Sequence, residues 1–74
     1  MVNVIVNGRI YQLAMGRSIY YVTAVRLAGK DRDAKDLTVT FKYKHGRSGS
    51  LTHDGGTIPA ADGLVINVFD TSNA

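Results

Sequence analysis

The chain has 74 residues, and nine Lys and Arg against six acidic residues give it a formal net charge of +3. This length fits one small domain, which buries only about 60% of the surface that its unfolded chain exposes, so a large enclosed active-site cavity is not expected. The sequence contains no cysteine, which excludes disulfides, thiolate nucleophiles and cysteine-ligated zinc.

The chain begins with a predicted β-hairpin. Residues 2–6 are rich in β-branched side chains, and residues 9–13 form a second short apolar run. Asn7-Gly8 lies between them, and this dipeptide is the strongest short-range signal for a hairpin, because both central positions of a type I′ turn need a positive φ.

A helix is predicted over residues 19–28. Apolar residues recur there at spacings of three and four, Ser18 is a suitable N-cap, and Gly29 followed by Lys30 is a typical C-terminal stop. The segment is also rich in β-branched residues, so a strand is the alternative interpretation.

The second half of the chain reads as strands separated by turns. After a mixed-charge loop over residues 30–36, apolar and polar residues alternate from Leu37 to Tyr43, which predicts a half-buried strand. A turn is predicted over residues 45–50, a short strand beginning at Leu51, a second turn at Asp54-Gly55-Gly56, a short edge segment over residues 57–59, a closing strand over residues 64–69 and a polar tail over residues 70–74.

These elements predict one α+β domain over residues 1–74, in which a mixed sheet of four to five strands packs on one helix in the order ββαβ(β)β. This order in so short a chain is that of the β-grasp fold, and the sequence resembles the bacterial ubiquitin-like proteins, including the multiubiquitin-type domains. The resemblance covers nearly the whole chain and rests on the order and spacing of six segments: Val6-Asn7-Gly8, Ser18 to Tyr21, Leu27-Ala28-Gly29, Leu37 to Phe41, Gly49-Ser50-Leu51 and Asp62 to Val68.

The resemblance implies a protein modifier, in some cases one that acts in defence against phage. Its implied partners are E1-like activating and E2-like conjugating enzymes, a deconjugating protease and a target protein. Conjugation or processing would use the C-terminal tail, Asp70, Thr71, Ser72, Asn73 and Ala74. The chain departs from the family here, because its only Gly-Gly pair, Gly55-Gly56, lies in a predicted turn and the tail ends in alanine. A non-conjugated interaction or self-assembly module is therefore the alternative function.

A partner-binding patch is predicted on the open face of the sheet. The Asn7-Gly8 turn pairs Ile5 with Ile10 on one face and leaves Val2, Val4 and Leu13 on the other. If Leu64, Ile66 and Val68 face the helix, the open face carries an apolar cluster with a polar rim that includes Thr40, and this cluster suits a protein partner or a second copy. A different hairpin register would exchange the faces. The predicted patch consists of Ile5, Ile10, Lys42, Val65, Asn67 and Phe69.

Other kinds of site have little support in the sequence. His45, His53 and Asp54 match no metal-ligand spacing, and the serines near His45 lack a framework that would orient a catalytic triad, so neither an enzyme nor a bound cofactor is expected. Residues 46–50 resemble a phosphate-binding loop only superficially, because no predicted helix follows them.

Nucleic acid and membrane are also disfavoured as partners. Lys42, Lys44, His45 and Arg47 form a basic cluster, but the alternation turns the ring of Tyr43 toward the core, whereas a stacking platform needs an outward ring. No apolar run approaches the roughly 18 residues of a membrane span. The N-terminus shows no basic region followed by an apolar stretch, so a cytoplasmic location is expected.

Overall fold

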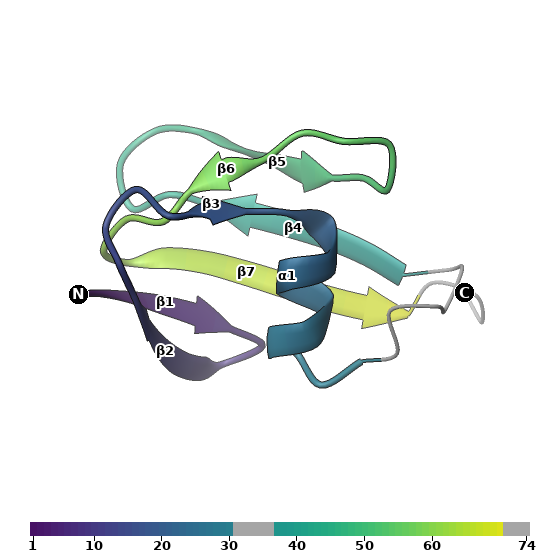
Figure 1. Ribbon diagram of the computed structural model, residues 1–74, viewed down its shortest axis with the longest axis horizontal. Helices are drawn as coiled ribbons and strands as arrows, with labels where there is room; N and C mark the ends of the chain where they lie inside the picture. The colour runs from purple at the N-terminus through teal and green to yellow at the C-terminus, as the bar shows by residue number, and fades with distance from the viewer. Residues whose placement is uncertain (31–36, 71–74) are drawn as a thin grey trace.

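The computed structural model describes residues 1–30 and 37–70. These residues form seven short strands and one helix (Figure 1). They are β1 (Val2–Val6), β2 (Arg9–Leu13), β3 (Ser18–Ile19), α1 (Tyr21–Leu27), β4 (Leu37–Lys42), β5 (Ser48–Leu51), β6 (Ile58–Pro59) and β7 (Leu64–Asp70).

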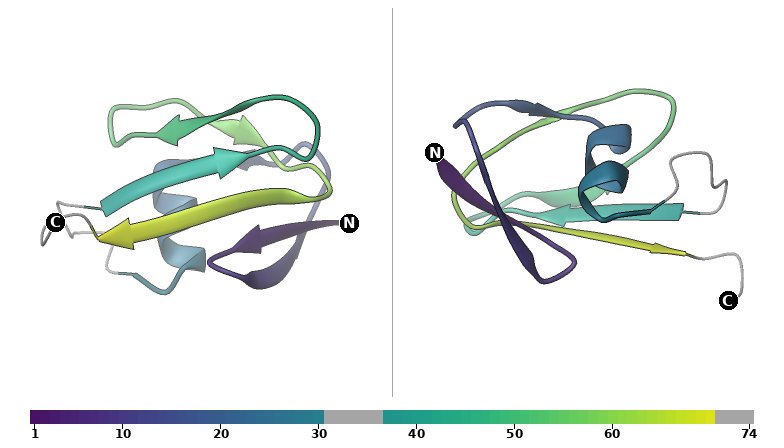
Figure 2. Two further views of the ribbon diagram at one scale, coloured as in Figure 1. Left: turned by 180° about the vertical axis from the view of Figure 1, so that it is seen from behind. Right: turned by 60° about the horizontal axis from the view of Figure 1, so that its bottom comes forward.

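The main sheet is mixed, and its five strands lie in the order β2-β1-β7-β4-β5. The first and last strands, β1 and β7, run parallel at its centre, and the other neighbours are antiparallel. The helix α1 covers one face, and the view from behind shows no helix or strand of the described residues over the other (Figure 2). The predicted α+β architecture, one helix on a mixed sheet, is therefore confirmed.

The core lies between the sheet and α1, and both the strands and the helix contribute side chains to it. Along β1 and β7, alternate residues are buried, as period-two strands require when one face is covered. The helix contributes Tyr21, Ala24 and Val25. The largest fully buried side chains are Ile19, Leu64, Ile66, Val4, Val6, Val25 and Val39.

The N-terminal hairpin forms as predicted. Asn7 and Gly8 have φ values of 50° and 81°, the positive angles that a type I′ turn requires. The observed register pairs Ile5 with Ile10 and Val6 with Arg9. The faces of β1 and β2 are therefore those that the two-residue turn predicted.

Asn7 also joins the hairpin to the closing strand. Its side-chain Nδ2 donates to the Val68 carbonyl oxygen at 2.9 Å, and the Val68 N–H donates to Asn7 Oδ1 at 2.7 Å. The Asn7 N–H donates to the Ile66 carbonyl at 3.0 Å. The backbone and side-chain amides of Asn7 thus extend the parallel pairing of β1 and β7 beyond the end of β1.

The predicted start of the helix is wrong. Ser18 is not the N-cap, and Ile19 is not helical, because these two residues form β3 and pair with Pro59 and Ile58 of β6. Tyr20 is the N-cap, and its N–H donates to Thr23 Oγ1 at 3.2 Å. Pairing with a strand about forty residues later buries Ile19 completely, and no local periodicity reports such a distant contact.

The predicted stop at Gly29 is confirmed, although α1 itself ends at Leu27 with Ala28 as its C-cap, one residue before the predicted end. Gly29 has a φ of 72°, and its N–H donates to the Arg26 carbonyl at 3.0 Å. The Lys30 N–H donates to the Val25 carbonyl at 3.1 Å. These two bonds form a Schellman motif, which satisfies carbonyls that have no partner within the helix.

Several predicted boundaries in the second half differ from the structure. The predicted turn over residues 45–50 ends early, because Ser48 begins β5 by pairing with Lys42, and β5 ends at Leu51. The strand that begins at Leu37 ends at Lys42, one residue before Tyr43. The closing strand continues to Asp70, which pairs with Leu37, so Asp70 belongs to β7 and not to the polar tail.

Candidate functional site

The open face of the sheet carries one row of aligned side chains that crosses all five strands. Strand pairing places Ile10 beside Ile5, Ile5 beside Val65, and Val65 beside Lys42. Ser48 continues the row at the far edge, opposite Lys42. Neighbouring strands lie about 4.8 Å apart, so Ile10, Ile5 and Val65 form a continuous apolar surface, which we call the apolar row.

The exposure of these side chains increases toward the edge of the sheet. Ile10 is 64% exposed, whereas Ile5 and Val65 are half-buried among their neighbours. Lys42 is exposed at the other end of the row. The structure therefore places an apolar surface on the open face at the predicted residues, with a cation beside it.

Two residues of the predicted patch lie apart from the apolar row. Asn67 and Phe69 share the open face with Val65, but Asn67 lies two residues and Phe69 four residues further along β7. Two residues of strand span about 6.6 Å, so Phe69 lies about 13 Å along the strand from Val65, with the exposed Asn67 between them. Phe69 is 45% exposed and pairs with Thr38, so it forms a separate apolar contact point.

The predicted conjugation tail is described only at its first residue. Asp70 is the last residue of β7 and is exposed. Thr71, Ser72, Asn73 and Ala74 lie outside the described residues.

The basic cluster beside β4 does not present an aromatic ring for stacking. Tyr43 is half-buried against the core, and its hydroxyl donates to the Pro59 carbonyl. The guanidinium carbon of Arg47 lies 5.3 Å from the centre of the Tyr43 ring, within cation–π range. The ring is thus held by contacts within the protein, as the alternation of residues 37–43 predicted.

Among the described residues, the two histidines do not gather with other side chains that could bind a metal. The His53 ring packs against the Tyr21 ring, with their centroids 4.1 Å apart. Within residues 1–30 and 37–70, no three His or acidic side chains gather into a possible metal site. The described part of the chain also contains no helix long and apolar enough to cross a membrane.

Tyr21 is the described residue with a clearly shifted pKa. Its side chain is only 4% exposed, and this burial raises the pKa of its hydroxyl above the ordinary 10.0. The hydroxyl therefore ionises more easily in the unfolded chain than in the native protein. Its contribution to stability is fully present below pH 10.0 and is lost as the pH rises through the raised native value.

We expect the wild type to lose more free energy of unfolding than Tyr21→Phe between about pH 9 and pH 11, because only the wild type must ionise this buried hydroxyl. Urea titrations across this range measure the difference. Tyr20→Phe removes the same atom from a ring that is 52% exposed and serves as the control. Equal alkaline losses in the wild type and Tyr21→Phe would contradict the assignment.

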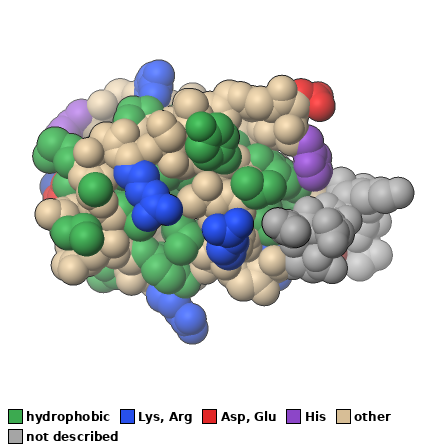
Figure 3. Space-filling model, in the orientation of Figure 1, with side chains coloured by type: hydrophobic (Ala, Val, Ile, Leu, Met, Phe, Trp, Pro, Cys, Tyr) green, Lys and Arg blue, Asp and Glu red, His purple; other side chains and the backbone are tan. Residues whose placement is uncertain are grey.

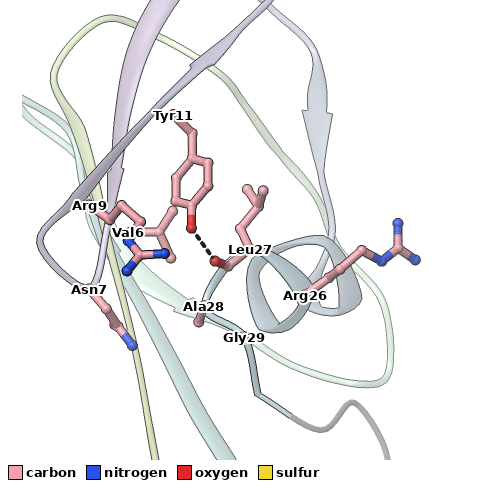
Figure 4. A pocket seen from close by; sticks show the side chains of 8 residues that line it. All are labelled: Val6, Asn7, Arg9, Tyr11, Arg26, Leu27, Ala28 and Gly29. Atoms are coloured by element: carbon pink, nitrogen blue, oxygen red, sulfur yellow. Dashed lines mark hydrogen bonds between the residues drawn. The ribbon is translucent and has the colours of Figure 1, made fainter.

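A groove of about 380 Å³ lies between the hairpin and the C-terminal end of α1 (Figure 4). Tyr11 lines it, and the Tyr11 hydroxyl donates to the Leu27 carbonyl at 2.6 Å. Arg9 and Arg26 also line it. Sequence reasoning missed this groove, because no motif connects residues 6–11 with residues 26–29.

Comparisons with known proteins identify no relative: no protein-family model, curated protein or solved structure matches this chain. The resemblance to bacterial ubiquitin-like proteins therefore stays a prediction.

Proposed function

We propose that this protein is a β-grasp protein-recognition domain that binds a partner protein through the open face of its sheet. The observation that carries the proposal is the apolar row of Ile10, Ile5 and Val65, which continues across the sheet to the exposed Lys42. The mixed sheet, the single helix and the parallel pairing of first and last strands are compatible with a β-grasp and support that part of the proposal.

The apolar row provides free energy for binding. Full burial of an isoleucine side chain contributes about 1.5–3 kcal/mol, and Ile10 retains most of its exposed surface in the free protein. Lys42 favours a partner with an acidic side chain at that end and disfavours a basic one. An apolar centre with a polar rim is the usual composition of a protein interface.

Ile10→Asp should abolish capture of the partner, because it places a carboxylate in the contact at a position where the proposed interface buries the isoleucine side chain. Ile10 is exposed in the free protein, so the variant should fold. Affinity capture from cells of the source, analysed by mass spectrometry, provides the measurement, and circular dichroism verifies the fold.

Met15→Asp is the matched control, because Met15 is 78% exposed and lies in the loop after β2, outside the strands that form the open face. The proposal requires a protein that is captured by the wild type and by Met15→Asp but not by Ile10→Asp. Equal capture by all three would overturn binding through this face. Self-association that is lost only in Ile10→Asp would identify the second copy as the partner.

Conjugation as a ubiquitin-like modifier is the second candidate function. It is favoured by the position of Asp70, which is exposed and ends the last strand of the sheet. In this proposal the sheet face is recognised by E1-like and E2-like enzymes, a protease reverses the attachment, and the carboxylate of Ala74 is joined to a target protein. A cytoplasmic location and a role in phage defence belong to the same proposal and stay predictions.

Intact-mass measurement tests the conjugation proposal. The protein is incubated with ATP and with E1-like and E2-like enzymes of its source, and a variant that ends at Asp70 is the control. A covalent adduct formed by the full chain and not by the shortened variant would establish conjugation despite the missing Gly-Gly. Without an adduct the modifier function fails, while recognition through the sheet face is tested independently by Ile10→Asp.

A further inference from the structure

Among residues 1–30 and 37–70, no strand lies at the outer edge of β2, because β2 is the first strand of the main sheet and pairs with β1. In a hairpin with a two-residue turn, the pair that closes the turn is hydrogen-bonded, which here is Val6 and Arg9. Hydrogen-bonded and non-hydrogen-bonded pairs alternate along the ladder. The backbone N–H and C=O groups of Ile10 and Gln12 therefore point away from β1, toward the unoccupied edge.

The two sides of this edge differ in chemistry. On the open face of the sheet, Ile10 begins the apolar row. On the helix side, Arg9 and Tyr11 line the groove together with the end of α1, and the polar Tyr11 hydroxyl crosses it to Leu27. A strand added at this edge would place alternate side chains over Ile10 and into the groove.

The charge on the groove side is positive. Arg9 and Arg26 are exposed, and none of the described residues that line the groove is acidic. Figure 4 shows that the side chain of Arg9 lies near Val6 and Asn7, whereas Arg26 extends from the helix in a different direction. The guanidinium groups do not converge on one point, which disfavours a single small anion and favours carboxylates spaced along a chain.

The surrounding surface has the same character. On the face that carries α1, separate Lys and Arg side chains stand out, and little acidic surface is visible among the described residues (Figure 3). The whole chain carries a net charge of +3. An acidic partner would be attracted to this side of the molecule before it makes any contact.

We propose that the free edge of β2 binds an extended acidic segment of a partner protein, which adds to the sheet as a further strand. Its backbone pairs with Ile10 and Gln12, its apolar side chains extend the apolar row at Ile10, and its carboxylates on the helix side face Arg9. This inference rests on the proposed recognition function and specifies the partner chemistry. A second copy pairing through β2 would bring the exposed Arg9 side chains of both copies to the same edge, which their like charge opposes.

The probe is a short synthetic peptide in which valine alternates with glutamate, and a peptide in which valine alternates with lysine is its charge control. We expect only the acidic peptide to bind, and amide hydrogen exchange at Ile10 and Gln12 to slow when it does, because their N–H groups then become hydrogen-bonded. Arg9→Glu should weaken binding about tenfold or more, since an attractive charge contact becomes repulsive.

Gln12→Pro and Gln12→Ala form a matched pair for the backbone contact. Both remove the side-chain amide, but only proline removes the N–H, and an edge strand tolerates proline where its N–H faces solvent. Loss of at least about threefold in affinity in Gln12→Pro relative to Gln12→Ala would support strand addition, because it corresponds to one hydrogen bond.

The hydrogen-exchange measurement on the wild type decides the question if Gln12→Pro fails to fold. Binding without slower exchange at Ile10 and Gln12, equal binding of the two peptides, or no binding of the acidic peptide would each overturn strand addition. Dimerisation of the free protein that protects the same two amides would overturn it in favour of a second copy. None of these results would overturn recognition through the open face, which is decided by the capture experiment with Ile10→Asp.

Discussion

Ile66→Ala should destabilise the protein by about 2–5 kcal/mol, the cost of removing a buried isoleucine side chain from a packed core. Ile66 is fully buried on the central strand β7, where its neighbours are Val6 of β1 and Phe41 of β4. A domain of this size has a stability near the lower end of the usual 5–15 kcal/mol, so we expect a large part of it to be lost. Urea denaturation followed by circular dichroism measures the change.

Ile10→Ala is the matched control, because it removes the same atoms from a strand residue that is 64% exposed. Its expected cost is about 1 kcal/mol or less, mainly the loss of a β-branched side chain from an edge strand. If the two substitutions cost the same, the assignment of the two faces of the sheet is wrong, and the proposed binding surface is wrong with it.

Asn7→Asp is the second substitution with a large expected effect. Aspartate tolerates the positive φ of this position nearly as well as asparagine does, so the turn itself is retained. The ionised side chain has no donor for the Val68 carbonyl and instead places a carboxylate oxygen against that carbonyl oxygen. We expect a loss of about 1–3 kcal/mol, the cost of leaving a partly buried polar group without its partner.

Asn67→Asp controls for the change of charge, because Asn67 lies on β7 next to Val68 but its side chain is exposed on the open face. Thermal unfolding at neutral pH should show a clear loss of stability for Asn7→Asp and a small change, within about 0.5 kcal/mol, for Asn67→Asp. Equal stability of Asn7→Asp and the wild type would mean that the side-chain bridge between the hairpin and β7 contributes nothing to the fold.

The predicted binding surface shows what the alternation of side chains along a strand can predict and what it cannot. A two-residue turn determines the hairpin register, and the register determines which side chains share a face, so Ile5 and Ile10 were predictable from the sequence. Val65 lies beside Ile5 because β7 pairs in parallel with β1, and this register aligns the two residues. Phe69 lies on the predicted face of the sheet, but too far along β7 to contact the apolar row. Alternation shows which side chains share a face, but it does not show how far apart they lie.

Local sequence determined those features of this protein whose physical cause lies within a few residues. Asn7-Gly8 specifies the turn through its backbone angles, Gly29 ends the helix through its positive φ, and alternation in residues 37–43 specifies the half-buried strand. Each of these depends on steric and hydrogen-bonding preferences of adjacent residues.

Tertiary structure alone decided the features that depend on distant partners. Ile19 became a strand residue because it pairs with Ile58, and Asp70 became part of β7 because it pairs with Leu37. The groove exists because Tyr11 meets the end of α1 at Leu27. In each case a contact between remote segments of the chain decides the outcome, and it can override a local preference. Such a contact cannot be predicted from the residues that adjoin it in the sequence.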